Sequence, residues 1–387
     1  MPRAVLLDLT PLVTPSTLRG IGRYVRGLSE GLTEVGAQSD LELQGLVADS
    51  NVSRLDLLQD IAAYAQEPAI MPRRRALKRR NRLICLGAPR LARRVGGLLH
   101  FTDPAGFPLS GRAGHCLTCH DLIPIALPEY GPPIPGMSRA KLAFERLRYQ
   151  RARRILAVSH ATKRDLCERL QISPTQVDVV WHGVNHRVFH PTPAAGELER
   201  VQGALGDRRP YVLYVGAGDL RKDLTTLVSA FAQSRLSREG VLAIAGQMPP
   251  ERVTSLRAQV AALGMIERVK LLGYVEEGLV PALYRNAAVN VFPSRYEGFG
   301  FPVLEALAAG CPTITSPNSS LDEVAGDAAV IIPCGDPDAL AGALERVVYD
   351  SEQRKSLRER GFARAATFTW TACAEQTLAF WRRALSA

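Results

Sequence analysis

The chain has 387 residues, 46% of them hydrophobic, and its 48 lysines and arginines against 38 aspartates and glutamates give a formal net charge of +10. This length predicts two domains, and the apolar content excludes a disordered chain. The apolar run before Asp8 is too short for a signal-peptide core or a membrane-spanning helix, so we expect a cytoplasmic protein whose seven cysteines form no disulfides.

Short apolar runs alternate with helical segments in the first half of the chain. This alternation is typical of βα units in a doubly wound parallel sheet. A helix is expected from Gly22 to Val35, closed by Gly36. The expected strands of this half are residues 4–9, 97–101, 115–119, 155–159 and 177–181.

The excess of positive charge also lies in this half. Arg73 to Arg94 holds ten basic residues and no acidic one. A solvated helix face and a contact with anionic lipid are both open for this stretch, and the apolar residues between the arginines of residues 83–99 would suit an interfacial element. Nucleic acid is not expected, because no aromatic residues for base stacking are interleaved there.

The alternation restarts after residues 190–210, which are rich in proline, glycine and alanine and are expected to link two domains. The predicted division is an acceptor domain at 1–193, a donor domain at 194–366 and a last helix at 367–387 that packs back on the first domain. The second half has expected helices at 223–233, 250–264 and 279–287, and expected strands at 211–216, 241–246, 269–274, 289–294 and 312–316.

Residues 294–312 carry the densest chemical signal, a strand followed by a glycine loop and a helix. Pro302 suits the first helical position, and Gly310 suits the helix end. The loop would therefore present backbone N–H groups at a helix N-terminus, where a phosphate or a sugar oxygen binds well. Its residues are Gly298, Phe299, Gly300 and Phe301.

Two carboxylates flank this loop, Glu297 before it and Glu305 one turn into the helix. An ionised carboxylate accepts two hydroxyl hydrogen bonds side by side, which matches the diols of a sugar and a ribose. The alternative is a buried helix with a solvent-facing Glu305 and an ordinary turn at 297–301.

The segment EGFGFPVLEALAAGCP resembles the donor site of the family 4 retaining glycosyltransferases, which have the GT-B fold of two facing doubly wound domains with a cleft between them. The resemblance extends over essentially the whole chain in order and spacing. It includes the segments GIGRYVRGL, HDLIPIALPEY, VSHATKRDL, WHGVNHRVFHP, VGAGDLRKDL, SSLDEVAGDAA and the final FTWTACAEQTLAFWRRAL.

In the donor half, the resemblance implies that Glu305 binds the ribose hydroxyls and Glu297 the transferred sugar, while the amides of 299–301 approach the sugar and phosphate. Lys222 and Arg221 would hold the diphosphate. A cation is required there, because the leaving group develops negative charge and no metal is expected to neutralise it. A surface pair that caps a helix is the plainer alternative for these two residues.

The resemblance assigns further contacts to both halves. Gly20 and Gly22 match a glycine loop that faces the diphosphate, and His120 matches a histidine close to the transferred sugar, although a simple turn histidine is the alternative. Tyr274 and Val275 lie where related proteins contact the base through backbone groups.

Three positions depart from the pattern of the family. Ala217 stands where many relatives have arginine, Asp223 where asparagine or glycine is usual, and Asn185 where aspartate is usual. Ala217 would leave Arg221 as the second cation for the diphosphate.

The reaction implied by the resemblance is a retaining transfer of a hexose, with a front-face mechanism and without metal or cofactor. The acceptor would be a glycan or a lipid-linked glycan of cell-surface polysaccharide synthesis, at the inner membrane leaflet, and mannose from GDP-mannose is the preferred donor. A nucleotide-sugar 2-epimerase of the same fold, and a non-catalytic basic protein that binds a membrane or nucleic acid, are the alternatives. The non-catalytic protein would be expected to lack Lys222, Glu297 or Glu305, and all three are present.

Two motifs suggest metals or haem but fit other structures better. Cys116, Cys119 and His120 spell C-x-x-C-H, but the two cysteines fall on opposite faces of an expected buried strand. Asp336 and Asp338 form D-x-D, which here is typical of a helix N-cap with proline in the first turn.

Overall fold

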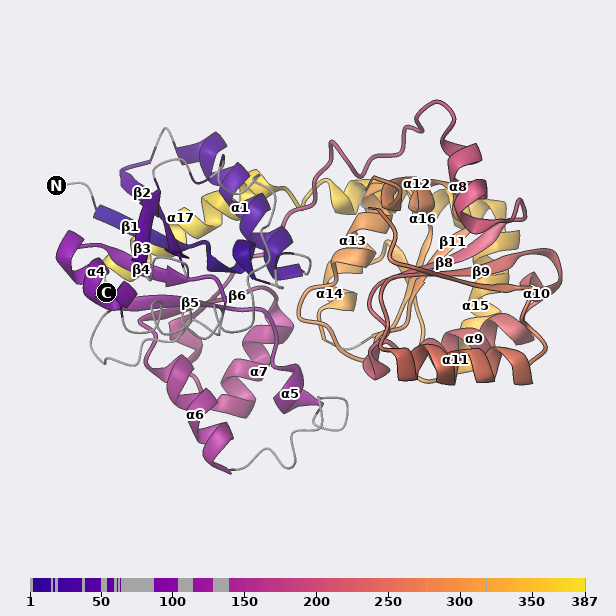
Figure 1. Cartoon of the computed structure of the whole chain (residues 1–387), viewed down its shortest axis with the longest axis horizontal. Coiled ribbons are helices and arrows are strands. Elements are labelled where there is room, and N and C mark those ends of the chain that lie inside the picture. The colour runs from indigo at the N-terminus through magenta and orange to yellow at the C-terminus, as the bar shows by residue number, and fades with distance from the viewer. Residues whose placement is uncertain are drawn as a thin grey trace. The chain divides into compact units, whose positions relative to one another are not determined.

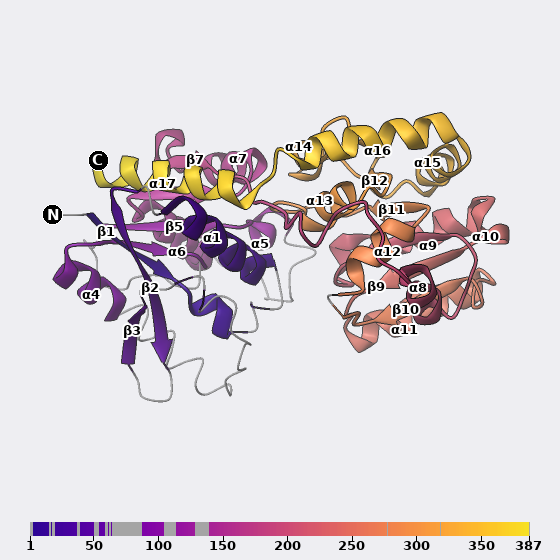
Figure 2. The same ribbon diagram turned by 90° about the horizontal axis from the view of Figure 1, so that it is seen from above.

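The computed structural model describes residues 3–14, 17, 20–36, 39–49, 54–58, 61, 63, 87–103, 114–127, 139–276, 278–317 and 319–386. The chain forms two compact units, shown in Figures 1 and 2. Unit 1 comprises residues 1–183 and 368–387, and unit 2 comprises residues 184–367. The last helix thus belongs to the same unit as the N-terminal half.

Unit 1 is built on a seven-stranded sheet in the order β3-β2-β1-β4-β5-β6-β7. All neighbouring strands are parallel except β2 and β3, which form an antiparallel pair. The strands are β1 (Arg3–Asp8), β2 (Leu41–Asp49), β3 (Arg54–Leu58), β4 (Leu98–Phe101), β5 (His115–Cys119), β6 (Arg154–Ala157) and β7 (Val177–Val179).

The helices of unit 1 lie on both faces of this sheet. On β4, Leu99 and Phe101 belong to one apolar core cluster, whereas His100 between them bonds Trp381 of the last helix. Because successive side chains of a strand alternate between faces, that helix covers the other face. The helices are η1 (Thr10–Val13), α1 (Gly20–Gly36), α4 (Ala88–Val95), α5 (Ile123–Ala126), α6 (Arg139–Gln150), α7 (His160–Leu170), η5 (Pro174–Gln176) and α17 (Trp370–Ser386).

Unit 2 is built on an entirely parallel sheet in the order β10-β9-β8-β11-β12-β13. The strands are β8 (Tyr211–Val215), β9 (Val241–Ala245), β10 (Val269–Gly273), β11 (Val289–Phe292), β12 (Thr313–Thr315) and β13 (Ala329–Ile331). The helices that cover them are α8 (Glu197–Leu205), η6 (Leu220–Lys222), α9 (Leu224–Gln233), α10 (Leu236–Glu239), α11 (Pro250–Ala262), α12 (Val280–Asn286), α13 (Phe301–Ala308), α14 (Leu321–Ala325), α15 (Pro337–Tyr349) and α16 (Ser351–Ala365).

All ten strands expected from the sequence are present, and the structure adds β2, β3 and β13. β2 was missed because its sequence, LELQGLVAD, mixes polar and apolar residues. β2 is stabilised by its pairing with β1 on one side and β3 on the other, which its own residue pattern does not indicate.

The stretch expected as a linker contains a helix, α8. Gly196 and Gly206 adopt left-handed conformations at its two ends. Glu197 at its start is buried and accepts hydrogen bonds from Arg285 and Asn286 of α12. The ion pair between Glu197 and Arg285 therefore holds α8 against α12 within unit 2.

The expected glycine loop at residues 20–22 is also different in the structure, because Gly20 and Gly22 form the first turn of α1. A Cβ atom on Gly22 would lie 2.3 Å from the carbonyl oxygen of Thr17. A side chain at position 22 would therefore clash with the backbone at Thr17, so glycine is needed where the chain passes close to the start of the helix.

No helix within the described ranges is both long enough and apolar enough to cross a membrane.

Candidate active site

The expected phosphate-binding cations and Glu297 meet at the carboxyl end of the sheet of unit 2. β8 and β11 are neighbours in this sheet, so the loops that follow them leave at the same edge. We call residues 216–223 the β8 loop and residues 293–300 the β11 loop. The β8 loop carries Arg221 and Lys222 on the short helix η6, and the β11 loop carries Glu297.

Three donors converge on a single oxygen of Glu297. Its Oε1 accepts hydrogen bonds from Nζ of Lys222 at 2.5 Å, from Nη1 of Arg221 at 2.6 Å and from Oγ of Ser294 at 2.6 Å. Arg221 also donates to the carbonyl oxygen of Tyr296 at 2.8 Å. Each of these hydrogen bonds to the carboxylate reaches Oε1, which leaves Oε2 available to accept a hydroxyl group.

This cluster is buried, and its charges are coupled. The side chains of Lys222 and Glu297 are 8% and 12% exposed. Burial alone would raise the pKa of Glu297, but the positive charges of Lys222 and Arg221 outweigh it and lower the pKa below its ordinary value. Burial, assisted by Arg221, lowers the pKa of Lys222, whose ammonium group lies 4.7 Å from the centre of the Phe292 ring.

The glycine loop is held in place by two serine side chains. Oγ of Ser319 accepts a hydrogen bond from the backbone N–H of Glu297 at 2.9 Å. Oγ of Ser320 lies 2.9 Å from the carbonyl oxygen of Glu297 and 2.8 Å from that of Phe299, and donates its hydrogen bond to them. Gly300, at the N-cap of α13, has φ = 108°, a conformation that only glycine adopts easily.

The other donor-half residues lie at this edge or close to it. Glu305 is 2% exposed, one turn into α13, so the alternative of a solvent-facing side chain is wrong. Phe299 is buried and lies edge-on to Phe301. Gly298 lies in the β11 loop beside them.

Tyr274 and Val275 follow β10, at the same edge, but β9 and β8 separate β10 from β11. The side chain of Tyr274 is 61% exposed, whereas Val275 packs against the apolar core of unit 2.

In unit 1, His120 directly follows β5 and contacts two other rings. Its ring centroid lies 5.2 Å from that of Tyr24 of α1 and 5.9 Å from that of His182. Nε2 of His120 lies 2.7 Å from the carbonyl oxygen of Thr102. A carbonyl oxygen only accepts, so Nε2 carries the proton, and Nδ1 of the neutral ring is an acceptor.

The two histidines are neutral near pH 7. Burial lowers the pKa of His120, against the opposing effects of the Thr102 carbonyl, Asp103 and Asp121. Burial also lowers the pKa of His182 well below its ordinary value. A neutral His120 can accept a hydrogen bond from a sugar hydroxyl through Nδ1.

The sequence did not single out several residues that shape these groups. Ser294, Ser319 and Ser320 were missed because serine is common in loops, although Ser319 and Ser320 lie within a segment that carries the family resemblance and Ser294 lies three residues before another. His182 lies in another such segment, and its contact with His120 depends on the fold, in which β5 and β7 lie on either side of β6 in one sheet.

The motifs discounted for metals have structural roles. Cys116 and Cys119 are fully buried in β5. Asp336 is the N-cap of α15 and accepts a hydrogen bond from the backbone N–H of Ala339 at 2.9 Å, as expected. Among the residues that the structure describes, no group of three or more histidine, cysteine, aspartate or glutamate side chains could hold a metal ion.

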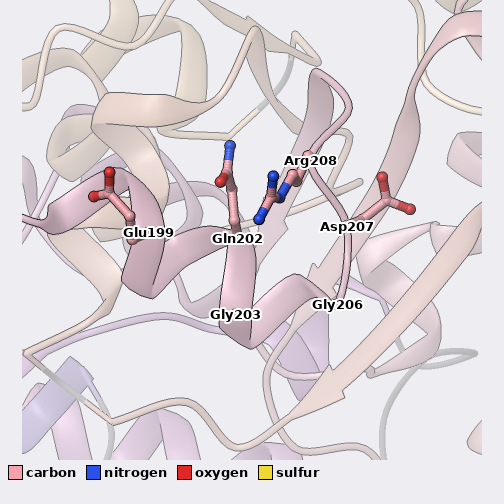
Figure 3. Close-up of a pocket in the computed structure, with 6 residues that line it drawn as sticks. All are labelled: Glu199, Gln202, Gly203, Gly206, Asp207 and Arg208. Atoms are coloured by element: carbon pink, nitrogen blue, oxygen red, sulfur yellow. The ribbon is translucent and has the colours of Figure 1, made fainter.

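A hollow of about 510 Å³ lies beside α8 in unit 2 (Figure 3). It contains none of the expected site residues, since its lining is Glu199, Gln202, Gly203, Gly206, Asp207 and Arg208. We assign it no role.

Comparison with known proteins matches both halves of the chain. Residues 18–188 match the model of "Glycosyltransferase Family 4", and residues 196–364 match that of "Glycosyl transferases group 1". O-antigen chain mannosyltransferase B of Escherichia coli is 30% identical over 265 residues, which cover 67% of this chain and 68% of the relative. MMP alpha-(1->4)-mannosyltransferase of Mycolicibacterium hassiacum is 28% identical over 298 residues, 75% of this chain and 68% of the relative.

Solved structures share the fold over the full length. Sucrose-phosphate synthase of Thermosynechococcus elongatus is similar with a TM-score of 0.74 at 22% identity, covering 99% of both chains. HepE of Anabaena, solved with UDP and glucose, has a TM-score of 0.72 at 14% identity, with 98% of this chain and 100% of that one covered. The chain therefore has the GT-B fold and belongs to the group 1 glycosyl transferases.

Proposed function

We propose that this glycosyltransferase moves a hexose from a nucleoside-diphosphate sugar to a glycan or lipid-linked acceptor, with retention at the anomeric carbon and without a metal ion. The observation that carries the proposal is the convergence of Lys222 and Arg221 on Oε1 of Glu297. Two cations held beside a carboxylate would neutralise the diphosphate leaving group while Oε2 of Glu297 binds a sugar hydroxyl.

The proposed chemistry needs no nucleophile from the protein. The bond between the anomeric carbon and the diphosphate oxygen breaks, and the acceptor oxygen bonds to the same face of that carbon. The acceptor proton passes to the departing phosphate oxygen. Lys222, Arg221 and the N–H groups at the start of α13 stabilise the negative charge that develops on the diphosphate.

The roles of the remaining residues follow the same proposal. Glu305, buried in α13, would accept the ribose hydroxyls, and the backbone at Tyr274 and Val275 would contact the base. Gly20 is exposed at the start of α1 and would let the diphosphate approach the backbone, whereas Gly22 is buried against Thr17. Nδ1 of His120 would accept a hydrogen bond from the sugar.

We propose mannose from GDP-mannose as the first donor to test. The relatives named O-antigen chain mannosyltransferase B and MMP alpha-(1->4)-mannosyltransferase support the sugar. The neighbour solved with UDP and glucose makes UDP-glucose the necessary comparison.

The test measures binding and turnover with EDTA present, using GDP-, UDP- and ADP-sugars separately. One nucleotide diphosphate should raise the melting temperature of the wild type. Lys222→Ala should weaken its binding tenfold to a hundredfold, because a charge-assisted hydrogen bond contributes about 1.5 to 3 kcal/mol. The melting temperature of the Glu305→Ala variant should not rise when the nucleotide is added.

Lys270→Ala is the matched control. Lys270 lies on β10, is partly exposed, and pairs with Asp207 at 3.9 Å. Its effect on nucleotide binding should be small. Binding that requires a divalent cation, or no binding of any nucleotide sugar, would refute the proposal. Release of an epimerised sugar without acceptor would favour the epimerase alternative.

We also propose that unit 1 contacts an anionic membrane surface, which for a cytoplasmic enzyme is the inner leaflet. Residues 73–86 of the basic stretch lie outside the described residues. Within α4, Arg90, Arg93 and Arg94 are exposed, but Ala88 and Ala92 pack into the core. Of the apolar residues of α4, Val95 is exposed at 39%, so this helix offers only a small apolar surface beside its arginines.

More exposed apolar side chains lie on α6. Leu142, Phe144 and Leu147 are 37%, 42% and 38% exposed, and Arg146 on the same helix is exposed. α6 contributes Tyr149 to the core cluster that also receives Ala88 and Ala92, so α4 and α6 cover the same face of the sheet. Arginines beside exposed apolar residues suit an interfacial surface.

Sedimentation with vesicles containing about 30% phosphatidylserine tests this surface, since each cation near an anionic leaflet contributes about 1 kcal/mol. The double variant Phe144→Ser, Leu147→Ser should bind the vesicles less, with its melting temperature unchanged. Equal binding of this variant and the wild type would refute the role of α6.

A further inference from the structure

A second ion pair joins the β8 loop to the β11 loop beside the Glu297 cluster. Nη2 of Arg295 lies 2.9 Å from Oδ2 of Asp223. The backbone N–H of Arg295 also donates to the carbonyl oxygen of Arg221 at 2.8 Å. Arg295 therefore contacts the β8 loop through both its main chain and its side chain.

Asp223 has a backbone conformation that its residue type does not favour. It has φ = 53° and ψ = 41°, in the left-handed region, between η6 and α9. Glycine adopts this conformation without strain. Aspartate brings a negative charge to this position, which glycine or asparagine would not.

Both oxygens of this carboxylate are used inside the protein. Oδ1 accepts a hydrogen bond from Oγ1 of Thr226 at 2.9 Å, whereas Oδ2 forms an ion pair with Arg295 but accepts no hydrogen bond from it. Asp223 is 7% exposed, so its negative charge is poorly solvated and sits next in sequence to Lys222. Without a cation of its own, this charge would attract Lys222 away from a ligand.

The order of the charges specifies how the two loops meet. The β8 loop has cations at 221 and 222 followed by an anion at 223, and the β11 loop has a cation at 295 followed by an anion at 297. Arg221 and Lys222 pair with Glu297, and Asp223 pairs with Arg295, so two sets of opposite charges join the loops.

A third loop leaves room for the Arg295 side chain. A Cβ atom on Gly335, which follows β13 and has φ = 72°, would lie 2.8 Å from Nη2 of Arg295. The guanidinium group therefore rests against the backbone of this loop while it pairs with Asp223.

We propose that Arg295 is a positioning residue for the diphosphate, which neutralises Asp223 so that the charges of Lys222 and Arg221 stay available to the donor. This inference rests on the proposed function of the site. It assigns the pair between Asp223 and Arg295 a role in ligand binding beyond holding two loops together.

The test uses Arg295→Met, Asp223→Asn and the double variant in the full chain, with calorimetric titration of GDP, UDP and their monophosphates. Arg295→Met should weaken binding of the preferred diphosphate about tenfold, equivalent to about 1.4 kcal/mol, and weaken the monophosphate less. The donor KM should rise more than kcat falls. Asp223→Asn in the Arg295→Met background should restore most of the affinity, because the uncompensated charge is gone.

Two further variants separate positioning from folding. Arg295→Lys keeps a cation and should stay close to wild-type affinity. Arg209→Met is the matched control, because it removes an arginine that pairs with Asp207. The side chains of Arg209 and Asp207 are 36% and 8% exposed, close to the 34% and 8% of Arg295 and Asp223. Arg209 precedes β8, at the opposite edge of the sheet, so its loss should leave diphosphate affinity unchanged.

The outcomes distinguish this inference from the proposed function. If the wild type binds a diphosphate and Arg295→Met lowers only the melting temperature, the positioning role is refuted. A double variant no better than Arg295→Met would also refute it. If the wild type binds no nucleoside diphosphate, the proposed function fails, and this inference fails with it.

Discussion

Glu297 organises its surroundings through one oxygen. Lys222, Arg221 and Ser294 all donate to Oε1, so the carboxylate is oriented before any ligand arrives. Preorganised charges of this kind cost no rearrangement at the moment of reaction. Because Lys222 is buried in the same cluster, its protonation state should affect how tightly a diphosphate binds, and this effect can be measured.

Binding of the diphosphate should weaken at alkaline pH. Burial lowers the pKa of Lys222 below the ordinary lysine value, so the free protein loses this ammonium proton at a lower pH than a surface lysine does. Diphosphate binds the protonated form, and its affinity should therefore fall as pH rises through the lowered pKa. Titration calorimetry between about pH 7 and 10, below the ordinary lysine pKa of about 10.4, measures this decline.

Lys222→Arg provides the control, because a guanidinium stays charged throughout this range. The ratio of wild-type to variant affinity cancels the titration of the nucleotide itself. A ratio that stays constant with pH would contradict the assignment of Lys222 to the diphosphate.

Among the elements, α1 and α17 form a tight contact that depends on glycine. A Cβ atom on Gly27 of α1 would lie 2.0 Å from the ring of Trp370, and one on Gly31 would lie 2.2 Å from its carbonyl oxygen. Gly183 makes a similar approach to the backbone of Trp370. Figure 2 shows α17 running alongside α1 in unit 1.

Gly27→Ala should destabilise unit 1, because the added methyl group has no space beside Trp370. Overpacking of this kind costs about 1 to 3 kcal/mol, more than alanine gains in helix propensity. Chemical denaturation followed by tryptophan fluorescence measures the free energy of unfolding.

Gly203→Ala in α8 is the matched control. Nothing lies within 4 Å of a Cβ atom at Gly203, so this change should stabilise its helix by up to about 1 kcal/mol. Equal effects of the two substitutions would mean that the contact with Trp370 is not tight.

At the scale of the whole molecule, the histidines with lowered pKa values that the structure describes are unevenly divided between the two units. His100, His120 and His182, whose pKa values burial lowers, all lie in unit 1. The pKa of His100 falls to about 3, and its Nδ1 accepts the hydrogen bond from Nε1 of Trp381 at 2.9 Å. Protonation of this ring would remove that acceptor.

Unit 1 should therefore lose stability at mildly acidic pH before unit 2 does. Below about pH 6.5 the unfolded chain binds protons on these histidines while the folded unit does not, so stability falls as pH decreases toward their lowered pKa values. In unit 2 the carboxylates with lowered pKa, Glu197, Asp207 and Glu297, begin to cost stability only below about pH 4.5.

Hydrogen exchange read by peptide at several pH values from about 7.5 to 5, spanning the ordinary histidine pKa, separates the two units. Protection should decrease in β4, β5 and α17 and stay constant in β8, β9 and β11. A uniform decrease across both units, or none, would contradict the prediction.

The sequence by itself determined the features that local patterns encode. The apolar runs of β8, β9 and β11 and the strand, glycine loop and helix of residues 289–312 are each contiguous, so their residues alone indicate the structure. The family motif adds Lys222, Glu297 and Glu305 as candidates.

Tertiary structure decided which of these residues meet, because strand order and helix packing set contacts between distant parts of the chain. Glu297 lies 75 residues from Lys222 in sequence, and Trp381 lies 281 residues from His100. The single acceptor oxygen of Glu297 and the pair between Asp223 and Arg295 depend on β8 and β11 being neighbours in the sheet. No local pattern carries that information, since it arises only when the whole sheet has formed.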